Sequence, residues 1–145
     1  MLKMEPNMPS LFDKHQMSSF LEEVFPQIKG RIEIVSLSKE KAIVRLNVSN
    51  ADLRPGNTVS GPSMFLLADV TFYIAVLSNI GKEALAVTTN CNINFLRKPA
   101  SCNIIAESRI LKRGSSLIVG DVILKSDNSE AVLAHATFTY SLPRM

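Results

Sequence analysis

The chain has 145 residues and a mass of 16.0 kDa, which predicts a single domain. Its formal net charge is only +3, aromatic residues make up 6%, and Trp is absent. So small a charge and so few aromatic side chains argue against a nucleic-acid-binding surface. The two cysteines, Cys91 and Cys102, are too few for a disulfide scaffold and fit no zinc-ligand spacing, so we expect buried thiols.

The N-terminal part predicts an irregular tail over residues 1–14 and a short amphipathic helix over residues 15–25. Apolar residues in this helix recur at intervals of three and four, and Pro26 ends it. Residues 1–10 contain no apolar core of a signal peptide, so we expect a cytoplasmic protein.

Two strands are predicted next, over residues 31–37 and 41–48, paired as a hairpin. In the second strand Ala42, Val44, Leu46 and Val48 alternate with mainly polar residues, which is typical of a strand with one buried face. Residues 50–59 predict a loop, marked by the sequence Pro-Gly-Asn at residues 55–57.

The most apolar stretch of the chain, residues 62–80, predicts a long helix whose only charged residue is Asp69. Its length alone would allow a membrane span. A carboxylate inside the span and the absence of cationic flanks favour a buried core helix instead. Pro62 suits the first turn of this helix, and Gly81 suits its end.

Four more strands are predicted over residues 85–95, 101–111, 115–124 and 130–140, with short connections that favour antiparallel neighbours. A helix that is apolar on nearly all sides must be covered on nearly all sides. A curved antiparallel sheet of about six strands, wrapped around the helix, would cover it. We therefore expect an α+β hotdog fold, with its core over residues 31–142 of one domain spanning residues 1–145. The alternative is another two-layer sandwich with the helix lying flat on one sheet face.

Two features of the long helix suggest chemistry. Asp69 is costly to bury as an ion without partners, so it is either a structural carboxylate or a general base or nucleophile. The N–H of Gly61, at the start of the helix, is either an ordinary cap or a donor to a developing oxyanion. Eight residues of helix separate the two by about 12 Å, so they could share one substrate only across two antiparallel helices of a dimer.

Residues 57–69 (NTVSGPSMFLLAD) and 85–99 (LAVTTNCNINFLRKP) resemble the PaaI-like acyl-CoA thioesterases of the hotdog superfamily. The resemblance covers roughly residues 31–142. It implies that Asp69 is the catalytic acid, that Gly61 is the oxyanion donor, and that Thr88 positions the attacking water. Three positions depart from the family pattern: Ser60 replaces a His, Pro62 replaces a Gly, and Arg54 replaces an Asn that orients the acid.

The resemblance also suggests residues that bind the substrate. Basic side chains could meet the phosphates of coenzyme A, although they could equally be solvated turn charges. The acyl group would lie near Phe65, Leu66 and Phe72. The candidate substrate-binding residues are Ser60, Arg54, Asn57, Phe65, Arg97, Lys98, Lys112 and Arg113. His135, between two alanines of a strand, is expected to be a histidine of the sheet face.

These observations predict hydrolysis of an acyl-CoA thioester to a free acid and coenzyme A. Asp69 of a partner chain would act as general base or as nucleophile, and the sequence leaves both routes open. No metal or redox cofactor is expected, and coenzyme A enters only as part of the substrate. We expect a homodimer or a dimer of dimers, with no nucleic-acid or membrane partner. The alternative is a hotdog protein that binds acyl-CoA without turnover.

Overall fold

The computed structural model describes residues 9–82 and 84–143. The first element is α1 (Lys14–Val24), which begins one residue before the expected range. Asp13 caps this helix: its carboxylate accepts a hydrogen bond from the N–H of Gln16, and its own N–H donates to the Gln16 side chain. A short 3₁₀ turn, η1 (Pro26–Ile28), follows. Most of the predicted N-terminal tail, residues 1–8, lies outside the described residues.

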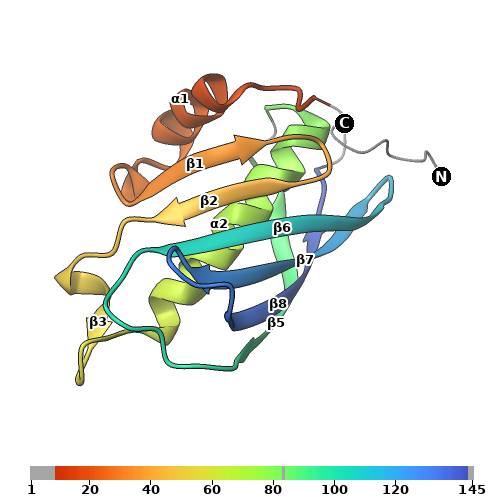
Figure 1. Ribbon diagram of the computed structural model, residues 1–145. Coiled ribbons are helices and arrows are strands. Elements are labelled where there is room, and N and C mark those ends of the chain that lie inside the picture. The colour runs from red at the N-terminus through yellow and green to blue at the C-terminus, as the bar shows by residue number, and fades with distance from the viewer. Residues whose placement is uncertain (1–8, 83, 144–145) are drawn as a thin grey trace.

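Six strands form one antiparallel sheet in front of the long helix α2 (Gly61–Ile80), as Figure 1 shows, in the order β1-β2-β6-β7-β8-β5. The strands are β1 (Ile32–Leu37), β2 (Ala42–Leu46), β5 (Val87–Phe95), β6 (Ile104–Arg113), β7 (Leu117–Ser126) and β8 (Val132–Ser141). This confirms the α+β hotdog fold and the hairpin of β1 with β2.

The position of β5 corrects one expectation. Consecutive strands were expected to be neighbours, but β5 pairs with β8 at the sheet edge and not with β6. The connecting residues 96–103 can span about 26 Å when extended. Crossing two intervening strands needs only about 14 Å, at about 4.8 Å per strand. A connection of this length therefore does not force its two strands to pair.

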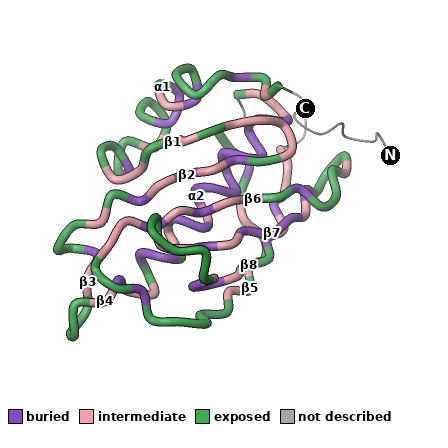
Figure 2. Tube along the Cα trace, in the orientation of Figure 1, coloured by how far each residue is buried: buried purple, intermediate pink, exposed green. Residues whose placement is uncertain are grey.

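The long helix α2 is a core helix. Its length and apolarity would allow a membrane span, but 78% of its most apolar window is buried inside the molecule, mainly against β2, β6 and β7. Figure 2 shows this burial along α2. Ser60 caps the start of α2, and Gly81, with φ +90°, ends it.

The centre of the core lies where α2 meets β7 and β8. The ring of Phe72 is fully buried and stacks on Phe138, with 5.3 Å between centroids. Gly120 allows this approach, because a Cβ there would lie 2.5 Å from the Phe72 ring and 2.2 Å from the carbonyl oxygen of Arg109. Phe72 therefore belongs to the packed core, and the expectation that it borders an acyl site is wrong.

The predicted loop over residues 50–59 contains more structure than expected. It holds a 3₁₀ turn, η2 (Asn50–Asp52), and a small hairpin of β3 (Leu53–Arg54) with β4 (Thr58–Val59). Asn57 adopts φ +59° at the hairpin turn, a conformation that Asn tolerates better than most residues. This segment leads directly into α2.

Candidate functional site

The first half of α2 carries a stripe of residues that the rest of the chain does not cover. Four residues are exposed or half-buried: Pro62, Phe65, Leu66 and Asp69. The residues between them, Ser63, Met64, Leu67 and Ala68, are buried. The spacing of three and four places the four uncovered residues on one helix face. The prediction that the helix is covered on nearly all sides is therefore correct for its second half only. We refer to these four residues as the α2 stripe.

Asp69 is the polar end of the α2 stripe, and two hydroxyl groups hold its carboxylate. Thr88 Oγ1 on β5 donates to Asp69 Oδ1 at 2.7 Å, and the Tyr140 hydroxyl on β8 donates to the same oxygen at 2.8 Å. Tyr140 also lies 3.2 Å from the Asp69 backbone oxygen. Among the described residues, Asp69 Oδ2 has no hydrogen-bond donor. The carboxylate is thus fixed through one oxygen, with the other available.

A β-bulge in β5 decides that Thr88 faces Asp69. The pairing with β8 runs from Thr88 with Tyr140 to Asn90 with Thr139, so Thr89 has no partner. Strict alternation along a strand would place Thr88 on the face opposite to Cys91 and Ile93. The extra residue reverses the face, and all three now lie on the helix side.

Tyr140 is the site residue that sequence reasoning missed. It is nearly fully buried and packs against Phe72 and Tyr73. Burial, and next the charge of Asp69, raise the pKa of Tyr140 well above its ordinary value, so its hydroxyl keeps its proton. The sequence placed Tyr140 in a strand, but it gave no signal that the strand ends beside Asp69.

The start of α2 is held by a network of polar groups around Asp52. Ser63 Oγ donates to Asp52 Oδ1 at 2.7 Å, and the N–H of Ser60 donates to the Asp52 carbonyl oxygen at 2.7 Å. Arg31 forms an ion pair with Asp52 at 2.5 Å. Burial alone would raise the pKa of Asp52, but hydrogen bonds from Ser49, Ser63 and Arg31 outweigh it and hold the pKa below its usual value.

This network leaves one N–H of the helix start unused. The N–H of Ser63 donates to Ser60 Oγ, and the N–H of Met64 donates to the Ser60 carbonyl oxygen. Pro62 has no N–H. Among the described residues, the N–H of Gly61 has no partner, so it can donate to a ligand.

A pocket of about 530 Å³ opens beside Gly61. It brings together three of the predicted basic residues, Arg54, Arg97 and Lys98. Phe95 borders it as well, with its ring 3.5 Å from where a Cβ of Gly61 would lie. The pocket therefore combines a backbone donor, an aromatic wall and positive charge.

The other predicted residues lie elsewhere or have other contacts. Lys112 and Arg113 belong to β6 and not to a turn as expected, and Arg113 lies by the last residues of α2, about 30 Å along the helix from Gly61. Ser60 acts as the helix cap, and Asn57 forms the hairpin turn. Phe65 lies on the α2 stripe and is 39% exposed.

Neither cysteine has the surroundings of a nucleophile. Burial, and next the charge of Asp69, raise the pKa of the Cys91 thiol, and burial, with the charge of Asp127, raises that of Cys102. His135 lies on the sheet face, with Nε2 3.1 Å from Asp121. Across the described residues, no group of three or more His, Cys, Asp or Glu side chains is arranged to hold a metal.

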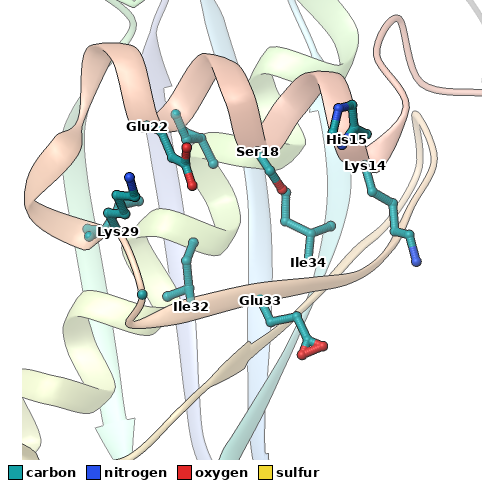
Figure 3. A pocket seen from close by; sticks show the side chains of 11 residues that line it. Lys14, His15, Ser18, Glu22, Lys29, Ile32, Glu33 and Ile34 are labelled. Carbon is teal, nitrogen blue, oxygen red and sulfur yellow. The ribbon is translucent and has the colours of Figure 1, made fainter.

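A second pocket, of about 390 Å³, lies between α1 and β1. Figure 3 shows its lining, where Ile32 and Ile34 of β1 point toward α1 and Glu33 points to the other side of the strand. This pocket shares no lining residue with the pocket beside Gly61, so it is not part of the candidate site.

Comparison with known proteins identifies the family of the chain. The family model of the thioesterase superfamily matches residues 56–133, which include α2 and the strands β5, β6 and β7. The chain belongs to the thioesterase superfamily. A crystal structure from Silicibacter sp. TM1040, provisionally described as a thioesterase, is 51% identical, with a TM-score of 0.88 over 96% of this chain and 97% of that one. Thioester hydrolysis is thus the class of reaction that the family supports.

More distant relatives share the fold. PaaI of the Escherichia coli phenylacetic acid degradation operon is 22% identical, with a TM-score of 0.76 over 92% of this chain and 97% of that one. A hypothetical thioesterase from Streptococcus pneumoniae TIGR4, solved with coenzyme A, is 21% identical, with a TM-score of 0.74 over 88% and 96%. A protein of Saccharolobus solfataricus that is provisionally described as an esterase is 26% identical over 94 residues. The match covers 65% of this chain and 66% of that protein, just under two thirds of its length. The PaaI-like hotdog resemblance is confirmed.

Proposed function

We propose that this member of the thioesterase superfamily hydrolyses acyl-CoA thioesters, with Asp69 as the reacting carboxylate. The observation that carries the proposal is the contact of Asp69 with Thr88 and Tyr140 on an apolar, partly uncovered helix face. A carboxylate held through one oxygen can act on a substrate through the other without reorienting.

The reaction needs a donor at the carbonyl oxygen and a group that supplies the attacking oxygen. The N–H of Gly61 would stabilise the negative charge that develops on the carbonyl oxygen. Asp69 would take a proton from water while the water oxygen bonds to the carbonyl carbon. The C–S bond then breaks, and the thiolate leaves with that proton, giving acid and thiol. In the alternative route an Asp69 oxygen bonds to the carbonyl carbon, the C–S bond breaks, and the thiolate leaves. Water then hydrolyses the resulting anhydride, which releases the acid and restores Asp69, and the remaining proton of the water goes to the thiolate.

Two chains would be required for one such site. Gly61 and Asp69 are separated by about 12 Å of helix, too far to contact one carbonyl group. The α2 stripe and the free edge of β5 support a second copy here, because an uncovered apolar face and an unpaired edge strand both favour association. Leu85 and Val87, next to that edge, are 77% and 55% exposed.

The thiol carrier is proposed to be coenzyme A. Arg54, Arg97 and Lys98 surround the pocket beside Gly61 and suit the phosphates of this carrier. The neighbour from Streptococcus pneumoniae that was solved with coenzyme A supports the same choice. Lys112 and Arg113 lie too far from this pocket within one chain to join the set.

Turnover of short, medium-length and aromatic acyl-CoA substrates by the native protein and by Asp69→Asn tests the proposal. We expect the native protein to hydrolyse at least one class and Asp69→Asn to lose about 100-fold or more in kcat, because the amide cannot act as a base. Equal activity of the two proteins would remove Asp69 from the mechanism. Tight binding of acyl-CoA without turnover by the native protein would favour the non-catalytic alternative, which the departures at Ser60, Pro62 and Arg54 motivate.

A further inference from the structure

Two hydroxyl groups converge on a single oxygen of Asp69. Thr88 Oγ1 and the Tyr140 hydroxyl donate to Oδ1 at 2.7 and 2.8 Å, from two different strands. The two donors are register partners in the β5–β8 pair, so the sheet itself sets their separation. The backbone of Asp69 is fixed as well, because the residue lies within α2.

We propose that Tyr140 is a positioning residue of the reaction: with Thr88 it holds Asp69 Oδ1, so that Oδ2 is the oxygen that takes the proton or attacks the carbonyl carbon. This inference rests on the proposed function. An oxygen that accepts two short hydrogen bonds has little capacity left for a third partner. Oδ2 has no donor among the described residues and is therefore the oxygen that is left available to a substrate. Thr88, which the family resemblance assigned to the attacking water, then orients the carboxylate instead.

Tyr140 is suited to this task because its proton stays in place. Its ring is held by Phe72, at 5.4 Å between centroids, and by Tyr73, at 6.2 Å. Burial and the neighbouring charge of Asp69 raise the pKa of Tyr140, so the hydroxyl remains a donor at any pH of an assay. A donor that is fixed in this way limits the rotation of the Asp69 carboxylate.

The substitution Tyr140→Phe removes this donor and keeps the aromatic packing. We expect kcat to fall about 10-fold with KM changed by less than about 2-fold, since a hydrogen bond to a charged group is lost at the reacting residue. A fall in kcat without a matching change in KM is a result that a purely structural role would not produce. The melting temperature, measured in parallel, verifies that the variant is folded.

Tyr73→Phe is the matched control, because the Tyr73 hydroxyl donates to the Ala84 carbonyl oxygen at 3.0 Å and not to Asp69. It should keep kcat within about 2-fold of the native value. An unchanged kcat in Tyr140→Phe, or an equal loss in both tyrosine variants, would overturn the inference about Tyr140. If Asp69→Asn is inactive in the same assay, the proposed function still stands. Full activity of Asp69→Asn would overturn both.

Discussion

At the scale of single residues, Asp52 links three parts of the chain through one carboxylate. It is 1% exposed, and it joins Arg31 before β1 to Ser63 in the first turn of α2. Its native pKa lies below the ordinary value of 3.8. The ionised form therefore stabilises the fold, fully above the unfolded pKa, and this contribution is lost as the pH falls through the native pKa.

Asp52→Asn should lower the free energy of unfolding by about 2 kcal/mol at pH 7, because Arg31 and Ser63 lose a charged partner. At pH 3, below the ordinary value of 3.8, the Asp52 carboxyl of the unfolded chain is mostly protonated. The stabilisation by the ionised form, and with it the difference between the two proteins, should therefore be smaller than at pH 7. Urea unfolding at both values of pH measures the change. A difference that is independent of pH would show that the charge of Asp52 does not stabilise the fold.

Glu33→Gln provides the control for this substitution. Glu33 pairs with Arg45 at 3.1 Å, but its side chain is 54% exposed. Solvent screens such a pair, so we expect a loss below about 1 kcal/mol at pH 7. The contrast separates a buried structural carboxylate from an ordinary surface ion pair.

At the scale of elements, the β5 bulge is the feature on which the site depends. Thr88 and Thr89 are adjacent and chemically identical, but the bulge directs Thr88 to Asp69 and Thr89 to the carbonyl oxygen of Thr139 at 3.1 Å. The choice between them follows from strand geometry and not from residue type.

Thr88→Val should lower kcat about 10-fold, since valine keeps the shape of the side chain and removes the donor to Asp69. Thr89→Val should leave kcat within about 2-fold, because its hydroxyl contacts only backbone on the exposed side. Steady-state kinetics of the two variants under identical conditions measure the contrast. A larger loss in Thr89→Val than in Thr88→Val would mean that the active protein lacks the bulge.

At the scale of the whole molecule, the proposed site needs Gly61 from one chain and Asp69 from another. Gly61→Pro deletes the N–H of Gly61 at the first helical position, where proline is favoured, and the extended Ser60 before it suits a following proline. We expect this variant to lose about 100-fold in kcat. Gly61→Ala keeps the N–H and meets Phe95 only at an ordinary contact distance, so it should retain most of the activity.

Co-expression of Gly61→Pro and Asp69→Asn chains tests the shared site directly. In a mixed dimer, one of the two sites would combine an intact Gly61 with an intact Asp69. Random pairing should then restore about a quarter of the native rate, although each variant alone is inactive. Affinity tags on the two chains allow the mixed dimer to be purified and assayed. No recovery in the purified mixed dimer would place both groups of a site within one chain.

The sequence by itself determined the element types, the core helix and the residue most central to the proposal. Periodicity located the strands and α2, because a face buried on folding must be apolar at the period of its element. Asp69 stood out as the single carboxylate of an apolar helix, because a buried charge is costly unless it has partners. The other site residues were predicted only in part. Gly61, Arg54 and Arg97 border one pocket, whereas Arg113 lies at the far end of α2.

The tertiary structure alone decided which strand lies beside which, and hence what Asp69 contacts. Local sequence does not encode that β5 crosses to β8, because the connecting loop is long enough for either pairing. Nor does it encode the bulge that reverses Thr88, since one unpaired residue leaves the residue types unchanged. Tyr140 reaches Asp69 across 71 positions of sequence, and only the closed sheet brings the two together.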